Sequence, residues 1–471
     1  MDKSELPFLS ASALSRLIAS REVSPVEATE AYLERIEQVD GKLNSYITVC
    51  REEAIQAARE AERAIGAGRH LGPMHGIPVA VKDQFNTAGI RTTGGSSILA
   101  DFVPTEDSTV VANLKRAGAV LLGKLNMSEF AMAEIFHHPH GTPRNPWDLG
   151  RNPGTSSSGS GAATAAFLCA TSLGEDTGGS IRSPANQSGL VGLRPTWGRV
   201  SRYGVLGGSW SMDVVGPISR TVEDCAITFR AIAGHDPKDP YTWTAPVPDY
   251  RQALDGNIRG LRVGVIKEKA ESGQLDPEVR TATTRAVSIL GELGASVEDI
   301  SLPLTEHAGA ISMAIIFVEW AAVHRGTFEP HFDQLDHNNK VRFLTGGVVP
   351  AGAYYKAQKL RSLLRQQVLD ALEGVDVLVL PTSPVTARPV ESVPGIQSKE
   401  QMAAGLAGRL SFTGPFNLAG VPALSLPCGF SSDNLPMGLQ IVGRPFAEET
   451  VMKVARAYEQ NTEWHTKRPP I

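Results

Sequence analysis

The segment Gly174-Glu175-Asp176-Thr177-Gly178-Gly179-Ser180-Ile181-Arg182 places a serine directly after two glycines, between acidic residues and an arginine. Glycine tolerates positive φ, so the two glycines permit a tight turn whose successive N–H groups point at one place. Such a nest binds negative charge, as an oxyanion hole must. We therefore expect Ser180 to be a nucleophile and the N–H groups of Thr177, Gly178, Gly179 and Ser180 to form an oxyanion hole. The alternative is an ordinary glycine turn before a helix.

Two upstream segments supply the other groups that a serine nucleophile needs. A second Ser/Gly cluster spans residues 154–161, and Ser156 within it lies 24 residues before Ser180. Residues 76–83 form an apolar run that ends in Lys82. Desolvation at the end of a buried strand lowers the pKa of a lysine, which makes it a usable base. The alternatives are a lysine that reaches solvent and, for the cluster, a flexible linker or a phosphate loop, although the Gly-Lys-Ser/Thr of such a loop is missing.

Composition describes an ordinary globular chain of 471 residues, 42% hydrophobic and 20% charged, with a net charge of −5. No basic stripe supplies phosphate contacts, so we expect no nucleic-acid partner. The polar N-terminus and the lack of an apolar run of about 18 residues predict a cytoplasmic protein that does not contact a membrane. The four cysteines lack disulfide or metal-ligand spacing and are expected to be reduced. They are Cys50, Cys169, Cys225 and Cys428.

Apolar strands alternate with helical patterns along most of the chain. Helices are expected at 10–40, with a break at Ser24-Pro25, and at 51–66, and a last helix at 447–460. Strands are expected at 77–81, 119–123, 170–173, 261–266, 295–297, 375–381, 423–427 and 437–443, of which 77–81 and 375–381 are expected to be buried. This alternation predicts an α/β sheet covered by helices on both faces. We expect one domain over residues 1–471, with N-terminal helices at about 8–70 and a variable, more helical segment at about 235–375.

A histidine-rich stretch, His137-His138-Pro139-His140, is the one segment that suggests a metal. It contains a proline and has no acid or cysteine at ligand spacing, so we expect no metal and a loop packed beside the site. No cofactor is expected elsewhere. The Gly-x-Ser-x-Gly, Ser-x-x-Lys and His-Glu-x-x-His signatures of other hydrolases are missing.

Taken together, these segments resemble the amidase signature family of serine hydrolases. Residues 76–83 resemble its lysine strand, 153–163 its Gly-Gly-Ser-Ser-Gly-Gly segment with Thr155 and Ser158 in place of two glycines, and 176–182 its nucleophile segment. The resemblance covers nearly the whole chain and is weakest at about 235–345. Further matching segments are Pro143–Asp148, Gly192–Thr196, Gly216-Pro217, Arg220–Asp224 and Phe416–Gly420.

The resemblance implies a fold, a mechanism and a role for each matching residue. The fold would be a three-layer α/β/α sandwich around a large mixed β-sheet. Ser156 would sit on a cis peptide bond and bridge Ser180 to a neutral Lys82, and catalysis would pass through an acyl-enzyme on Ser180. Asp176 and Arg182 would support the loop without reacting.

The family contains both free-standing amidases and the A subunit of an aminoacyl-tRNA amidotransferase, which releases ammonia from glutamine. Residues 316–324 are more apolar than the Tyr-Asp-Gly-x-Arg-like stretch of the A subunit, and residues 137–141 resemble free-standing members. We therefore expect a free-standing amidase that hydrolyses an aryl or alkyl amide, with esters and carbamates (urethanes) as extensions. The A subunit is the main alternative, and a catalytically silent interaction protein is the other.

The acyl pocket is expected to be apolar and to suit a small-molecule amide. Phe317 and Trp320 could line this pocket or pack in the core. The sequence leaves open the identity of the substrate, the loops that gate the site and whether the chain forms a homodimer. The expected lining residues are Phe130, Ala131, Met132, Phe317 and Trp320.

Overall fold

The computed structural model describes residues 2–132, 138–390 and 396–471, without the side chains of 402–409. In this part of the chain one mixed sheet has the strand order β1-β3-β2-β4-β6-β5-β10-β11-β9-β7-β8. Its strands are β1 (Tyr46–Val49), β2 (Pro78–Lys82), β3 (Val120–Leu125), β4 (Thr171–Glu175), β5 (Val191–Arg194), β6 (Val215–Ser219), β7 (Arg262–Ile266), β8 (Ser296–Ile300), β9 (Val377–Pro381), β10 (Ala423–Phe430) and β11 (Pro436–Gly443).

The strands that carry the site lie side by side toward the β1 edge of this sheet. β2 runs parallel to both β3 and β4, and β4 is antiparallel to β6. Every residue of β2, β3 and β4 is buried. Strands buried on both faces need a helical layer on each side, which explains the mainly apolar sequences of β2 and β3. The buried hydroxyl groups of Thr171 and Ser172 in β4 form hydrogen bonds with Ser219 and Thr164 instead.

Helices cover both faces of the sheet. α7 and α14 pack against each other and against central strands, whereas α5 and α6 form a separate pair over the same part of the sheet. The predicted α/β layered fold with a large mixed sheet is therefore confirmed. The helices are α1 (Ala11–Ala19), α2 (Pro25–Leu43), α3 (Arg51–Gly66), α4 (Thr109–Arg116), α5 (Ser158–Ala165), α6 (Arg182–Ser188), α7 (Val222–Ile232), α8 (Lys267–Ala270), α9 (Pro277–Glu292), α10 (Ala308–Phe328), α11 (His337–Val348), α12 (Ala351–Gly374), α13 (Lys399–Ala419) and α14 (Glu448–Gln460).

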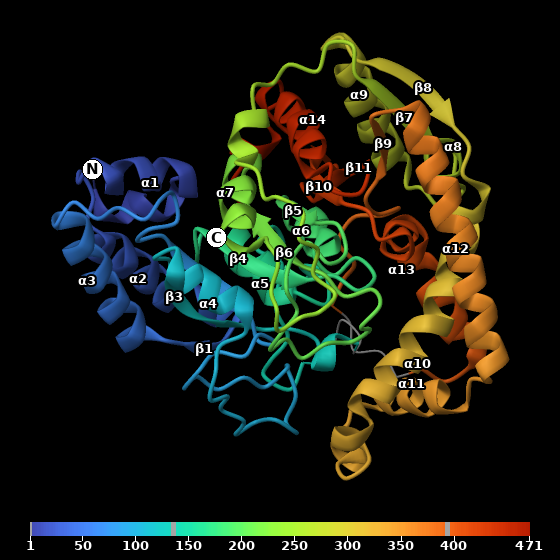
Figure 1. Ribbon diagram of the computed structural model, residues 1–471, viewed down its shortest axis with the longest axis horizontal. Helices are drawn as coiled ribbons and strands as arrows, with labels where there is room; N and C mark the ends of the chain where they lie inside the picture. Colours follow the sequence, from blue (N-terminus) through green and yellow to red (C-terminus); the bar gives the residue numbers. More distant parts are fainter. Residues whose placement is uncertain (1, 133–137, 391–395) are drawn as a thin grey trace.

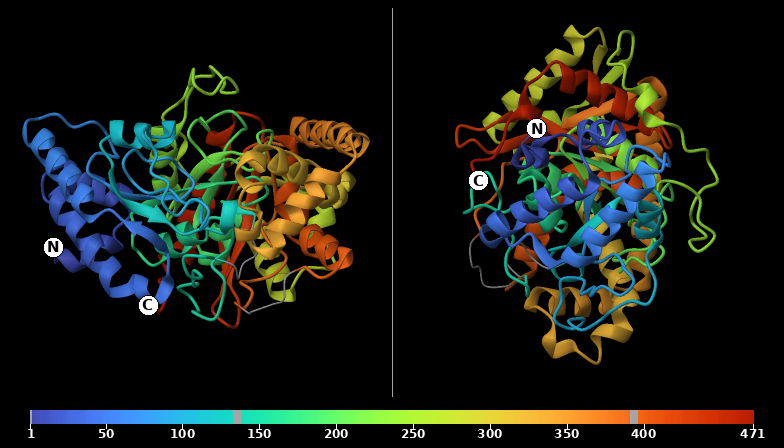
Figure 2. Two further views of the ribbon diagram at one scale, coloured as in Figure 1. Left: turned by 90° about the horizontal axis from the view of Figure 1, so that it is seen from below. Right: turned by 90° about the vertical axis from the view of Figure 1, so that its left-hand side faces the viewer.

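The N-terminal helices and the helices α10–α12 lie at opposite ends of the molecule (Figures 1 and 2). The predicted break between the first two helices is confirmed. Ser24 accepts hydrogen bonds from the backbone at the start of α2, Glu27 completes a capping box, and Pro25 occupies the first helical position. This arrangement satisfies N–H groups that have no partner within the helix.

The region from 235 to 375 contains α8–α12 and also the strands β7 and β8 at one edge of the sheet. The stretch Pro303–Phe328 is long and apolar enough to cross a membrane, judged by length and composition only. Of its apolar 18-residue segment, 61% is buried inside the protein. The sequence was expected to contain no such stretch. Its helix α10 packs against α11, α12 and α13, so burial within the protein accounts for its apolar character.

Candidate active site

Lys82 is the last residue of β2, and its side chain has no contact with solvent. Its Nζ lies 2.7 Å from Ser156 Oγ. Burial lowers the pKa of the Lys82 ammonium to about 8, against the opposing effect of the nearby carboxyl groups of Glu175, Asp176 and Asp213. A buried amine with a lowered pKa can lose its proton near neutral pH and then act as a base.

Ser156 lies in the turn before α5, after a cis peptide bond between Thr155 and Ser156. A residue from another segment helps to hold this turn, because the Ser128 N–H donates to the Ser156 carbonyl at 3.3 Å. Ser156 is 2% exposed, and what remains exposed lines the same pocket as Ser180. Ser156 therefore stands between the buried amine of Lys82 and the pocket.

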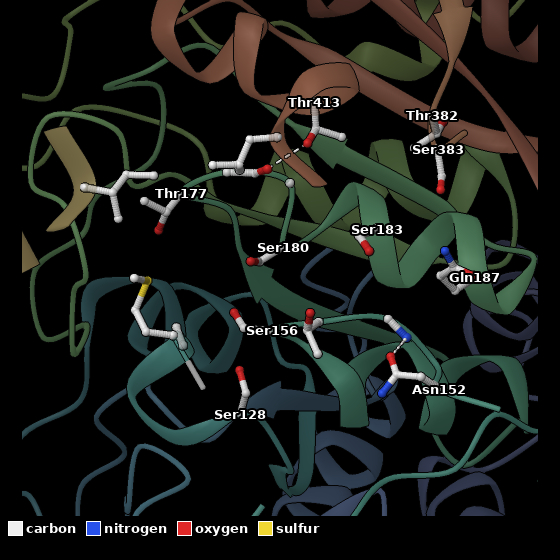
Figure 3. A pocket seen from close by; sticks show the side chains of 18 of the residues that line it. Ser128, Asn152, Ser156, Thr177, Ser180, Ser183, Gln187, Thr382, Ser383 and Thr413 are labelled. Atoms are coloured by element: carbon white, nitrogen blue, oxygen red, sulfur yellow. Dashed lines mark hydrogen bonds between the residues drawn. The ribbon is translucent and has the colours of Figure 1, made fainter. Parts of the chain in front are cut away.

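Ser180 lies in the turn between β4 and α6 and is half-buried. Both Ser180 and Ser156 point into the pocket (Figure 3). Gly179 has φ of +127°, and a Cβ atom there would meet Thr413 Oγ1 at 2.5 Å. The turn therefore requires glycine at this position for both its backbone conformation and its packing.

The N–H groups of this turn are not equivalent. Gly179 N–H donates to Asp176 Oδ1 at 2.7 Å, which removes it from the set of free donors that the sequence suggested. In the described chain, the N–H groups of Thr177, Gly178 and Ser180 donate to no carbonyl or side chain. The Gly-Gly-Ser sequence did not show which of these N–H groups stay free, because the Gly179 N–H is engaged only when the side chain of Asp176 folds back onto the turn.

Asp176 is the centre of a buried ionic cluster that holds the turn. Arg182 donates to its carboxylate through Nε at 3.1 Å and Nη2 at 3.0 Å, and Asn417 Nδ2 donates to it at 2.7 Å. Burial by itself would raise the pKa of Asp176, but Arg182 and Arg194 outweigh it and hold the pKa well below its usual range. Asp176 therefore stays ionised and links the turn to α13 and β5.

A second group of buried acids was missed at the level of sequence. Glu175 Oε2 lies 3.7 Å from Lys82 Nζ, and Thr177 Oγ1 contacts Glu175 Oε1 and Asp213 Oδ1, each at 2.7 Å. Glu175 could have been predicted as part of the site, because an acidic residue at the end of a buried strand needs a partner for its charge. Asp213 gave no such signal, because only the fold brings the loop before β6 to β4.

The pocket separates the expected substrate residues into two groups. Ala131, Met132 and Phe317 line it. Phe130 does not, which corrects the expectation for it, and Trp320 takes the core alternative that the sequence left open. Both pack with Phe328 and Leu335 in a separate cluster, and Trp320 Nε1 donates to the Phe130 carbonyl at 3.2 Å. Lining residues without a sequence signal come from distant segments: Ser128, Asn152, Ser183, Gln187, Met313, Ile316, Arg342, Thr382, Ser383, Arg388, Leu410 and Thr413.

The histidine stretch gives no metal site in the described residues, where no cluster of three metal-ligating side chains occurs. His138 Nδ1 lies 2.9 Å from the Met127 carbonyl oxygen, close to the Ser128 wall of the pocket. His137 lies outside the described residues.

Comparison with known proteins places this geometry in a family. A sequence model of the Amidase family matches residues 27–452, so the chain belongs to the amidase family, whose members carry the amidase signature. The A subunit of glutamyl-tRNA(Gln) amidotransferase from Moorella thermoacetica is 45% identical over 99% of both chains. The structure of the corresponding protein from Thermotoga maritima has a TM-score of 0.80 at 33% identity and covers 97% of this chain and 95% of its own. The structure of 6-aminohexanoate cyclic dimer hydrolase has a TM-score of 0.90 at 30% identity, and the match covers 98% of this chain and 99% of that hydrolase.

These relatives contradict one expectation from composition. The chain was expected to have no nucleic-acid partner, whereas the Moorella relative is part of an enzyme named for a tRNA. A net charge of −5 describes the whole surface on average. It does not report on tRNA contacts that other subunits of a complex can supply, so the exclusion was wrong.

The ionic cluster yields a prediction about stability. Asp176→Asn leaves Arg182 and Arg194 buried beside a neutral group, and we expect the free energy of unfolding to fall by about 3–5 kcal/mol. Chemical denaturation would measure the change. The control is Asp433→Asn, because Asp433 is 71% exposed and lies 3.6 Å from Arg151, and we expect that variant to lose less than about 1 kcal/mol. Equal losses in the two variants would contradict the role of Asp176.

Proposed function

We propose that this chain hydrolyses a carboxylic amide C–N bond with Ser180 as the nucleophile, Ser156 as the proton relay and Lys82 as the base. The proposal depends mainly on one observation. The buried Lys82 amine lies 2.7 Å from Ser156 Oγ, and Ser156 lines the same pocket as Ser180. Membership of the amidase family supports the reaction class.

In the proposed reaction neutral Lys82 takes the proton of Ser156, and Ser156 takes the proton of Ser180. Ser180 Oγ then bonds to the amide carbon, and negative charge develops on the carbonyl oxygen. The N–H groups of Thr177, Gly178 and Ser180 are the donors we assign to that oxygen. The C–N bond breaks as the proton returns through Ser156 to the leaving nitrogen, and a water molecule hydrolyses the acyl-enzyme by the same relay.

We predict that Ser180→Ala, Ser156→Ala and Lys82→Ala each lower kcat/KM by at least about a thousandfold, because each removes a group that the transition state needs. The matched control is Ser183→Ala, which changes another serine of the same pocket and should stay within about tenfold of wild type. Steady-state kinetics on a chromogenic amide would test this. Turnover by Ser180→Ala above about 1% of wild type would refute the assignment of the nucleophile.

The lowered pKa of Lys82 sets the expected pH dependence. The base must be neutral, so activity should be low while Lys82 is protonated and should rise as the pH increases through about 8. The measurement is kcat/KM between about pH 6 and 10 with a substrate for which chemistry limits the rate. A flat profile across this range would contradict a lysine base.

For the substrate, the first candidate is the amide of glutamine, with the chain acting in the cytoplasm as the A subunit of a glutamyl-tRNA(Gln) amidotransferase. Identity of 45% over 99% of both chains to the Moorella protein favours this candidate over a free-standing enzyme. The buried Arg342 lines the pocket and is suited to the carboxylate of an amino-acid substrate. The chain would then work with partner subunits in an enzyme that acts on tRNA.

The second candidate is a free-standing hydrolase of apolar amides, with esters and carbamates as extensions. The lining of the pocket favours it. Met132, Ile316, Phe317 and Leu410 give the pocket an apolar wall, and no Asp or Glu lines it within the described residues. The ammonium group of glutamine would need such a carboxylate, whereas an aryl or alkyl acyl group would not.

One assay separates these candidates. If the chain belongs to an amidotransferase, we expect it to release ammonia from glutamine, with a rate that increases when partner subunits and charged tRNA are added. Apolar p-nitroanilides, esters and carbamates should then be poor substrates. Turnover of these apolar substrates by the chain alone, with no glutamine hydrolysis under either condition, would favour the second candidate.

A further inference from the structure

Glu175 is the ionisable side chain nearest to Lys82, and the reaction described above does not use it. Its side chain is 1% exposed, and Oε2 lies 3.7 Å from Lys82 Nζ. The amide of Gln84 donates to Oε2 at 3.5 Å. A carboxyl group so close to a base must affect which of the two holds a proton.

The hydroxyl group of Thr177 shows that this part of the site contains an additional proton. Thr177 Oγ1 lies 2.7 Å from Glu175 Oε1 and 2.7 Å from Asp213 Oδ1, which is the usual length of an O–H···O hydrogen bond. A hydroxyl group has one proton and can donate to only one of these oxygens. The other contact then needs a proton on the carboxyl group, so one of the two acids is protonated.

The surrounding donors indicate which acid it is. Asp213 accepts hydrogen bonds from the N–H groups of Gly208, at 2.7 Å, and Ser209, at 2.9 Å, and such bonds stabilise a carboxylate. The Glu175 carboxyl accepts no backbone N–H within the described residues. Burial and then the charge of Asp213 raise the pKa of Glu175. Burial also raises the pKa of Asp213, but its backbone donors lower it in part.

We propose that Glu175 is a positioning residue for Lys82 and holds a proton while Lys82 is the neutral base. This inference rests on the proposed function of Lys82. The Glu175 O–H donates to Thr177 Oγ1, and the Thr177 O–H donates to the Asp213 carboxylate. Lys82 and Glu175 then hold one proton between them, so the lysine is neutral without an uncompensated carboxylate 3.7 Å away.

Other charges near Glu175 are already balanced. Asp176, the next residue, is paired with Arg182 at 3.0 Å and lies 3.6 Å from Arg194 of β5. Besides burial, Asp213 of the loop before β6 and, to a smaller extent, Asp176 raise the pKa of Glu175, whereas Lys82 of β2 lowers it. An ionised Glu175 would instead form an ion pair with Lys82, which would hold the lysine in its protonated, inactive form. The two protonation states therefore make opposite predictions for activity.

The first test is Glu175→Gln, because an amide N–H donates to Thr177 Oγ1 as a protonated carboxyl group does but never becomes an anion. We expect kcat/KM within about tenfold of wild type and a pH–activity midpoint that moves by less than about half a unit. Glu175→Leu cannot donate, and we expect it to lose at least about a hundredfold in kcat/KM. A midpoint lower by about one unit or more in Glu175→Gln would show that an ionised carboxylate had been stabilising the Lys82 ammonium, which would overturn the proposal.

The second test observes the proton itself and needs no change at Glu175. Protein labelled with ¹³C-glutamate should show the infrared carbonyl band of a protonated carboxyl group at neutral pH. The band should move in Thr177→Val, because the carboxyl group loses its acceptor. The control is Glu459→Gln, since burial raises the pKa of Glu459 to about 7 in α14, and this variant should leave both the Thr177-sensitive band and the pH–activity midpoint unchanged.

The two proposals fail in different ways. A missing band, or a band that Thr177→Val does not move, would overturn the assignment of the proton to Glu175 even if Ser180→Ala is inactive. Full turnover by Ser180→Ala would overturn the catalytic proposal, whereas the infrared result would still report the protonation of Glu175.

Discussion

The burial of one amine constrains the rest of this site. Lys82 is an ordinary surface residue type, yet here it has no contact with solvent and lies 2.7 Å from the hydroxyl oxygen of Ser156. Burial disfavours its charged form, and that same penalty makes the neutral form available as a base. Lys82 does not line the pocket, so in the proposed reaction a proton from Ser180 reaches it through Ser156. The packing around Lys82 therefore sets the order of the proposed relay.

The turn that carries Ser180 is held by a different kind of interaction. Asp176 accepts hydrogen bonds from Arg182, Asn417 and the Gly179 N–H, so an ionised carboxylate joins the turn to α6 and α13. Breaking a buried pair of this kind is costly because it leaves a charge without a partner. The cluster therefore holds the turn of Ser180, the proposed nucleophile. The Gly179 N–H, which could have bound an oxyanion, is used to hold the turn instead.

Sequence relatives and the lining of the pocket favour different substrates for this chain. The same fold is found in one component of a glutamyl-tRNA(Gln) amidotransferase and in a hydrolase of a cyclic dimer, and a fold by itself does not choose between such activities. The buried Arg342 suits an amino-acid carboxylate, whereas the apolar wall formed by Ile316, Phe317 and Leu410 suits an uncharged acyl group. Sequence identity of 45% favours the role in an amidotransferase. The charge of the chain does not decide the matter, since one member of a complex need not contact the nucleic acid itself.

Elements with local signals could be predicted from the amino-acid sequence. Apolar runs located most of the strands but missed β1, β5 and β6, and the predicted strand at 295–297 is the exposed β8. Ser24-Pro25 located the start of α2, and the Gly-Gly-Ser turn singled out Ser180. The contacts between side chains far apart along the chain followed only from the folded structure. It placed Phe317 in the pocket but Trp320 in a separate core cluster, and it engaged the Gly179 N–H with Asp176. It also joined Glu175 to Asp213 through Thr177. Periodicity and turn chemistry act over a few residues, whereas burial, charge pairing and the protonation state of an acid depend on neighbours that the order of the chain does not specify.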